Sequence, residues 1–217
     1  MRVAIAVLAY NRPGLLKRTL DSIPKGDHAY QLVILDNGST NEAADIVAER
    51  GGLRNHGENH NIGFGFRMAT HMALSWQPDL IVFSGDDYEY RNGWLRDLVQ
   101  FWTHAPDDIS IVGMCIEQIY LHNKIIGKVS CGGINGIQRA VTPGASWSFR
   151  SSDALEILRT VPHDSHKYDR RVCLETKKRI IELPLSTHIG LGHRIWTNEV
   201  QQIGKKVDWG KWGLDEF

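Results

Sequence analysis

Short apolar runs alternate with amphipathic segments through the first 90 residues, and this alternation constrains the fold more than any other feature of the chain. The apolar runs are rich in Val, Ile, Leu and Ala, as expected of buried strands. Strands that alternate with helices predict a parallel sheet with helices on both faces. The expected strands cover residues 2–9, 31–35 and 80–83, and the expected helices follow Pro13 and cover 41–50 and 63–76.

A polar cluster follows each of these three expected strands. The carboxyl ends of parallel strands meet at one edge of a sheet, which is where open α/β sheets bind their ligands. We therefore expect the three clusters to line one crevice. The clusters are Tyr10-Asn11, Asp36-Asn37 and Asp86-Asp87.

Asp86 and Asp87 follow the apolar run that ends near Phe83. Two adjacent carboxylates repel each other unless a cation or a proton relieves the repulsion. A divalent cation that takes oxygen ligands and also contacts phosphate is suited to such a pair. The pair therefore predicts a site for a metal-bound phosphorylated ligand. An acidic turn that caps the following helix is the alternative.

Charge and cysteine content narrow the possible partners and the compartment. Lys plus Arg and Asp plus Glu each total 25, so no net charge favours a polyanionic partner. The cysteines Cys115, Cys131 and Cys173 fit neither a disulfide framework nor a zinc site, which favours a reducing compartment. The start of the chain is too quickly polar for a signal peptide, and no apolar run approaches the ~20 residues that span a bilayer. We expect a cytoplasmic protein without stable membrane insertion.

The second half of the chain is less regular than the first. It contains no repeat, linker or charge run that would mark a domain boundary, so we expect a single domain over residues 1–217. Expected helices cover residues 92–104 and 168–178 and another begins at Ser152, while expected strands cover 109–116 and 124–129.

Several motifs, taken in order, resemble the inverting glycosyltransferases of family 2. The resemblance rests mainly on residues 7–12, residues 35–40, residues 59–65 and Ser84-Gly85-Asp86. Looser matches occur in residues 142–150, at Tyr168-Asp169 and in residues 183–190. The resemblance implies an α/β fold of the GT-A type, a Rossmann-like, mixed, mostly parallel sheet flanked by helices. It also implies that residues 1–90 bind a nucleotide sugar and that residues 91–217 bind the acceptor and carry a C-terminal tail.

On the donor side, the resemblance implies a UDP-like or dTDP-like nucleotide sugar. It assigns base recognition to Asp36, with Ala9 and Tyr10 as walls of the base pocket. The alternative for Asp36 is an Asx turn that satisfies its own backbone. Arg67 is a candidate partner of the diphosphate. The expected nucleotide-sugar-binding residues are Ala9, Tyr10, Asn11, Asp36, Gly63, Arg67, Ser84, Gly85 and Asp86.

For the metal, the resemblance implies a divalent cation, Mn²⁺ or Mg²⁺, held by Asp86 and His188. His193 is a rival for His188. Ser84 departs from the family, because it stands at the first position of the Asp-x-Asp motif. A serine supplies no charge there, and Asp87 is a candidate to compensate.

For catalysis, the resemblance assigns Asp169 as the base that deprotonates the acceptor hydroxyl. Asp164 and Glu175 are the alternatives, and an acid at a helix start is also favoured by the helix dipole alone. Tyr168 replaces the acid that precedes this base in the family, which is a second departure.

On the acceptor side, Trp147 is the expected sugar-stacking residue. Trp209 and Trp212 are candidates for a lid over the site, although core packing explains most tryptophans. A glycan precursor is the first choice of acceptor, with a protein or a hydroxylated DNA base as alternatives. The basic stretch at residues 167–179 would suit an anionic acceptor or a solvated helix face.

Two other functional classes fit parts of the sequence. A nucleotidyltransferase would also place acids at strand ends, but it would carry a Gly-rich basic loop where this chain has Tyr10-Asn11-Arg12-Pro13. A non-catalytic nucleotide-sugar-binding module is compatible with Ser84 and Tyr168. It would bind the donor without turnover.

Overall fold

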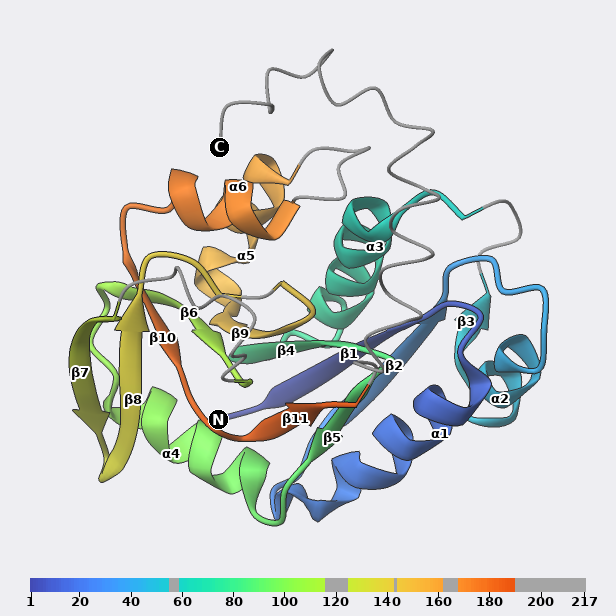
Figure 1. Ribbon diagram of the computed structural model, residues 1–217, viewed down its shortest axis with the longest axis horizontal. Coiled ribbons are helices and arrows are strands. Elements are labelled where there is room, and N and C mark those ends of the chain that lie inside the picture. Colours follow the sequence, from blue (N-terminus) through green and yellow to red (C-terminus); the bar gives the residue numbers. More distant parts are fainter. Residues whose placement is uncertain (55–58, 116–124, 143, 162–167, 190–217) are drawn as a thin grey trace.

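The structure is a computed structural model that describes residues 1–54, 59–115, 125–142, 144–161 and 168–189 (Figure 1). Its centre is a nine-stranded sheet in the order β3-β2-β1-β4-β9-β6-β10-β8-β7. These strands are β1 (Val3–Ala9), β2 (Gln31–Asp36), β3 (Leu53–Arg54), β4 (Leu80–Gly85), β6 (Ile109–Gly113), β7 (Ile125–Cys131), β8 (Ile134–Arg139), β9 (Ser146–Arg150) and β10 (Arg179–Glu182).

The sheet is mixed and mostly parallel, as predicted. Strands β3, β2, β1 and β4 run parallel, in agreement with the alternation in the first half of the sequence. Strand β9 then lies antiparallel between β4 and β6, which the sequence did not predict. Strand β10 returns parallel to β6, and β8 and β7 complete the far edge as an antiparallel pair.

Helices cover both faces of the sheet, so the molecule has three layers (Figure 1). Along β1, odd-numbered residues such as Val7 pack against one helical layer, and even-numbered residues such as Leu8 pack against the other. Burial on both faces explains why these strands read as continuous apolar runs. One layer contains α1 (Pro13–Ser22), α2 (Ala43–Glu49) and α4 (Trp94–His104), and the other contains α3 (Ile62–Leu74), α5 (Ser151–Thr160) and α6 (Tyr168–Glu175).

The three polar strand ends are brought together by the register of the parallel strands. Ala9 is paired with Asp36, and Leu8 is paired with Gly85. The backbone N–H of Asn37 also donates to the carbonyl oxygen of Ala9 at 2.9 Å. The residues that follow β1, β2 and β4 therefore emerge side by side, which confirms the expectation that they share one edge of the sheet.

A small second sheet adds a segment from late in the chain to this edge. It pairs β5 (Tyr88–Tyr90) with β11 (Ser186–His188) in antiparallel fashion. A short 3₁₀ helix (Ile23–Gly26) links α1 to the segment before β2. Because β5 follows the acid pair directly, β11 is held next to Asp86 and Asp87.

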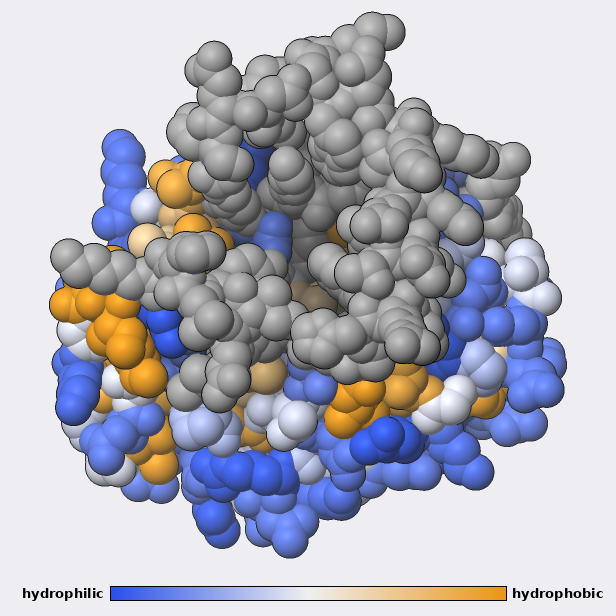
Figure 2. Space-filling view, viewed as in Figure 1, coloured by the Kyte–Doolittle hydropathy of each residue, from blue (hydrophilic) through white to orange (hydrophobic). Residues whose placement is uncertain are grey.

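The surface in Figure 2 is largely hydrophilic over α1 and α4, and apolar residues gather at the edge formed by β7 and β8. Ile125 and Ile126 of β7 contribute to this edge and are 53% and 57% exposed. Among the helices of the described residues, none is both long enough and apolar enough to cross a bilayer.

Candidate functional site

The two acids that follow β4 are nearly excluded from solvent. Asp86 is 0% exposed and Asp87 is 3% exposed. The guanidinium of Arg12 lies between them and contacts both carboxylates. Asp86 Oδ2 also accepts the backbone N–H of Tyr10 at 2.9 Å. The end of β1 thus supplies both a cation and a backbone donor to the acids at the end of β4.

Gly85 makes room for the second of these acids. A Cβ atom at this position would lie 3.0 Å from Asp87 Oδ1 and 3.5 Å from Ala145. Such an approach to a carboxylate oxygen is tighter than an ordinary van der Waals contact. The absence of a side chain at Gly85 therefore helps to set the position of the Asp87 carboxylate.

His188 completes the cluster from the small second sheet. Its Nε2 lies 2.9 Å from Asp87 Oδ2. Its ring stacks on Tyr88, with centroids 4.8 Å apart and an interplanar angle of 8°. The sequence placed His188 with Asp86, whereas the structure places its imidazole directly against Asp87.

The two acids have opposite pKa shifts. Burial raises the pKa of Asp86 to about 7, with a further contribution from the charge of Asp87 and opposition from Arg12. Burial acts on Asp87 in the same direction, but the hydrogen bond to His188 and the charge of Arg12 outweigh it and lower its pKa. Like charges in one buried site separate in this way because only one carboxylate is readily ionised.

Arg12 is positioned by the residue that precedes it. Asn11 adopts a left-handed backbone with φ of 53°. Its N–H donates to Ser39 Oγ at 2.9 Å, and its Oδ1 accepts the N–H of Thr40 at 2.8 Å. Its carbonyl oxygen accepts from Asn41 Nδ2 at 3.0 Å. In the structure Asn11, which was predicted to bind the donor, joins the turn after β1 to the turn after β2.

Asp36 makes the Asx-turn contact that the sequence left as its alternative. Its Oδ1 accepts the N–H of Ser39 at 3.0 Å, and its Oδ2 lies 3.4 Å from Arg54 Nε. The Asp36 side chain is fully buried, while that of Arg54 is 50% exposed. These contacts shape the turn at the end of β2, and base recognition by Asp36 stays a prediction.

The segment 59–65 is connected to this turn through Asn37. Asn37 Nδ2 donates to Asn59 Oδ1 and to the Asn61 carbonyl oxygen, both at 3.0 Å. Asn61 in turn caps α3, since its Oδ1 accepts the N–H of Phe64 at 3.1 Å. The start of α3 is thereby fixed beside the ends of β1 and β2.

A glycine allows the first turn of α3 to pack closely on β1. Gly63, a predicted donor-binding residue, is buried there. A Cβ at Gly65 would lie 2.6 Å from side-chain carbons of Leu8 on β1. Gly65 therefore serves close packing of α3 against the sheet.

Arg67 does not reach toward the acid pair. Its guanidinium donates to the carbonyl oxygens of Leu158 and Val161, at 2.5 Å and 3.1 Å. These are carbonyls at the C-terminal end of α5, which a cation stabilises. The prediction that Arg67 pairs with a diphosphate is not supported by this placement.

Two other predicted site residues, Ser84 and Ala9, are fully buried. Ser84 faces the buried hydroxyl of Tyr90, whose pKa is raised to about 12 mainly by burial. Ala9 is 0% exposed and lies in the core, whereas the neighbouring Tyr10 is 38% exposed. Of the two expected walls of a base pocket, Tyr10 alone presents its side chain at the surface.

The placement of Trp147 does not support the prediction that it stacks on an acceptor sugar. Trp147 is 0% exposed and belongs to the core cluster on one face of the sheet. Its ring meets that of Phe66 in an edge-to-face arrangement, with centroids 5.9 Å apart. The sequence pattern around it belongs to β9, a strand in the middle of the sheet.

Asp169 lies in the first turn of α6 and is linked to β4 through a short segment. Its Oδ2 accepts the N–H of Gly144 at 3.4 Å, and the next residue, Ala145, accepts the N–H of Gly85 at 2.6 Å. Glu175, an alternative base, is exposed and pairs with Arg171 at 2.7 Å. The other residues considered, Asp164, His193, Trp209 and Trp212, lie outside the described residues.

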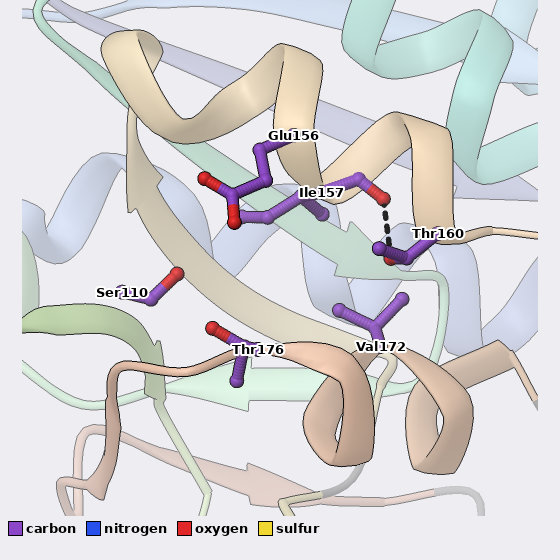
Figure 3. Close-up of a pocket in the computed structure, with 6 residues that line it drawn as sticks. All are labelled: Ser110, Glu156, Ile157, Thr160, Val172 and Thr176. Carbon is purple, nitrogen blue, oxygen red and sulfur yellow. Dashed lines mark hydrogen bonds between the residues drawn. The ribbon is translucent and has the colours of Figure 1, made fainter.

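The acid pair with Arg12 and His188 is the strongest candidate site. Sequence reasoning did not select Arg12, although its place directly after the polar end of β1 could have indicated it. Within the described ranges no three His, Cys, Asp or Glu side chains are arranged as a ready-made metal site. Figure 3 shows a cavity between α5 and α6 that lies elsewhere and holds no more than about one water molecule.

Comparisons with known proteins identify the family and the fold of the chain. Residues 4–127 match the sequence model of Glycosyl transferase family 2. No curated protein matches the chain. Solved structures of similar fold include S. aureus TarS 1-349, with a TM-score of 0.61, 16% identity and coverage of 85% of this chain and 58% of that one.

Two further structures share the fold. Mannosyltransferase PcManGT from Pyrobaculum calidifontis, in complex with GDP-Man and Mn²⁺, has a TM-score of 0.66, 16% identity and coverage of 89% of this chain and 59% of that one. Glucosyl-3-phosphoglycerate synthase from Mycobacterium tuberculosis, with Mg²⁺ and UDP, has a TM-score of 0.59, 14% identity and coverage of 86% and 70%. The chain thus spans less than two thirds of the first two proteins, and at these identities the likeness shows the fold alone.

Proposed function

The chain belongs to glycosyl transferase family 2, and we propose that it moves a sugar from a nucleoside diphosphate donor to an acceptor hydroxyl. Family membership supports the reaction class, and the fold is that of proteins solved with nucleotide sugars or nucleoside diphosphates. The donor would be UDP-like or dTDP-like. A glycan precursor is the acceptor class that we put first.

The observation that carries this proposal is the cluster at the aligned ends of β1 and β4. Asp86 and Asp87 are buried there, and Arg12 and His188 contact them from two other segments. Buried acids are costly for a fold unless a function or a partner compensates them. A cluster of this kind at the carboxyl edge of a parallel sheet lies where α/β proteins bind phosphorylated ligands.

The side chains of the cluster fit a divalent cation such as Mn²⁺ or Mg²⁺. Carboxylate oxygens suit both ions, and neutral imidazole is a common metal ligand in proteins. Asp87 and His188 already share a contact, and Asp86 is adjacent, so these three residues would hold the ion. When bound, the cation would stabilise the negative charge of the nucleoside diphosphate that leaves.

Asp169 is the proposed base of an inverting transfer. It would accept the proton of the acceptor hydroxyl, which then attacks the anomeric carbon of the donor sugar. Its link through Gly144 and Ala145 to Gly85 supports this role, because that link joins α6 to the strand that carries the acids.

A thermal-shift panel with UDP, GDP and dTDP and their sugars, with and without Mn²⁺, tests the donor site. Ligand that binds the folded state raises the melting temperature by mass action. We expect one nucleotide series to give a shift that Mn²⁺ enlarges and that Asp87→Asn removes. Glu89→Gln is a matched control, because Glu89 is an exposed acid on β5 that pairs with Arg18 at 2.7 Å.

A turnover assay distinguishes an enzyme from a module that only binds the nucleotide sugar. Release of nucleoside diphosphate from the donor identified in this way would be followed with glycan, protein and hydroxymethylated DNA acceptors in separate arms. Release with one acceptor supports transfer and names its class. Donor binding without release in any arm would instead support a non-catalytic module, and no binding by a folded protein would overturn the proposal.

A further inference from the structure

Arg12 has a position that the proposed reaction does not by itself explain. Its two terminal nitrogens contact different carboxylates, one of Asp86 and one of Asp87. The acid side chains are 0% and 5% exposed, whereas that of Arg12 is 35% exposed. The guanidinium therefore neutralises a buried acid pair from a more exposed position, in the region where the proposed cation would bind.

Arg12 and a divalent cation would compete for the same two carboxylates, because either one compensates their negative charge. One guanidinium offsets one of the two carboxylates, while a divalent cation offsets both. If both cations stayed, the buried cluster would gain positive charge that the acids alone do not balance, and like charges at short range repel strongly in a site of low dielectric. Binding of the metal thus favours departure of the guanidinium.

The backbone of Arg12 is held by contacts that do not involve its guanidinium. The Arg12 carbonyl oxygen accepts the N–H of Leu16 at 2.9 Å as α1 begins. The preceding Asn11 is bound through its backbone and side chain to the turn at Ser39, Thr40 and Asn41. Because the anchoring contacts are on the backbone and on Asn11, the guanidinium alone can leave the acids.

We propose that Arg12 is a positioning residue, the resident counter-ion of the Asp86–Asp87 pair, which a divalent cation displaces when a nucleoside diphosphate binds. This inference rests on the proposed function. A released guanidinium is a strong partner for phosphate oxygens, with which it forms paired hydrogen bonds. The exchange makes metal binding weak in the absence of nucleotide and strong in its presence.

Titration of the full chain with Mn²⁺ tests the exchange, because the electron paramagnetic resonance signal of free Mn²⁺ reports binding without any turnover. The titration would be run alone and with UDP or GDP for the wild type, Arg12→Gln, Arg12→Lys and Arg18→Gln. Arg18 is a matched control on α1, since it is exposed and pairs with Glu89 outside the acid pair.

We expect Arg12→Gln to bind Mn²⁺ alone about tenfold more tightly than the wild type, within the usual range of coupling between sites. The enhancement by nucleotide should shrink in the same variant, because the competing cation is gone. Arg12→Lys should lie between the two, since an ammonium cannot bridge both carboxylates. Arg18→Gln should match the wild type.

The outcomes separate this inference from the proposed function. A merely structural Arg12 would leave Mn²⁺ affinity unchanged or weaken it in both Arg12 variants, and that result would overturn the inference while the proposed function stands. Arg12→Lys keeps a positive charge, so it remains informative if Arg12→Gln does not fold. Failure of the wild type and all variants to bind Mn²⁺, with or without nucleotide, would overturn both.

Discussion

His188 Nε2 lies 2.9 Å from Asp87 Oδ2, although the two residues are 101 positions apart in the chain. The small sheet of β5 and β11 creates this contact, because it pairs His188 with Tyr88, the residue that follows Asp87. The antiparallel pairing thus delivers an imidazole from the late part of the chain to the acid pair at the end of β4.

Replacement of His188 by Ala should weaken metal-dependent donor binding about 10- to 100-fold, the usual cost of losing a group that holds or orients a metal ligand. The fold should persist, because the residue lies in a short edge sheet. Isothermal titration with donor and Mn²⁺ measures the effect. His104→Gln, at an exposed position on α4, is the control. Equal donor affinity in both variants would remove His188 from the site.

Asp86→Asn should flatten the pH dependence of stability in the metal-free protein. The pKa of Asp86 is raised from 3.8 to about 7 by burial, so the folded state holds a proton that the unfolded state has lost. The contribution of Asp86 to the free energy of unfolding is therefore fully present below its pKa in the unfolded state. That contribution is lost as the pH rises through its pKa in the folded state. Between about pH 6 and pH 8 the free energy of unfolding of the wild type should fall by roughly 1 kcal/mol, and that of the variant should not show this fall.

Urea unfolding in the presence of a chelator, at both pH values, measures this difference. Comparison of wild type with Asp86→Asn isolates the contribution of Asp86 from the histidines, which titrate in both proteins. Parallel pH profiles for the two proteins would show that Asp86 is already ionised in the metal-free fold.

Gly85→Ala should disturb the position of Asp87, since the new Cβ would lie 3.0 Å from Asp87 Oδ1. We expect weaker donor and metal binding and a loss of stability of about 1–3 kcal/mol, as for other overpacked sites. Gly14→Ala is the control, because nothing lies within 4 Å of a Cβ there. Thermal melts with and without donor would reveal the change, and a Gly85 variant that resembles the control would contradict it.

Ser84→Asp, which restores the first acid of the Asp-x-Asp motif, should destabilise the protein and should not improve donor binding. Ser84 is 0% exposed and faces the buried hydroxyl of Tyr90, so the new carboxylate would be buried without a cation. We expect a loss of several kcal/mol, as for an unpaired buried charge. Chemical denaturation measures the loss in free energy of unfolding, with Ser84→Ala as the matched variant. Tighter donor binding by Ser84→Asp would show that position 84 reaches the ligand.

Asp169→Asn should lower kcat at least ~100-fold, the contribution expected of a general base, while donor affinity stays unchanged. Glu175→Gln is the control, because Glu175 is an exposed acid at the other end of the same helix and pairs with Arg171. Nucleoside diphosphate release under saturating donor gives kcat, and titration gives affinity. Loss of turnover in the Glu175 variant alone would move the base to that residue.

The parallel half of the sheet could be predicted from the sequence, and the region around β9 could not. Strands β1, β2 and β4 are buried on both faces, so their apolar runs identify them without reference to the rest of the chain. In β9 polar and aromatic residues alternate, which normally indicates one exposed face. Ser148 is nevertheless fully buried, because its hydroxyl accepts from Trp102 Nε1 at 2.9 Å. That partner lies 46 residues away in the chain, so the local sequence pattern around Ser148 does not predict it.

By itself, the sequence determined the strand–helix alternation, the shared edge of the polar strand ends and the family, because apolar periodicity and turn chemistry are properties of neighbouring residues. The tertiary structure alone decided that Arg12 contacts both acids, that His188 meets Asp87 and that Trp147 and Ser84 are buried. The partner of a charge and the burial of a side chain depend on strand register and on which distant segments pack together. Those choices are settled by the whole fold, since burial and Coulomb interactions act across space and not along the chain.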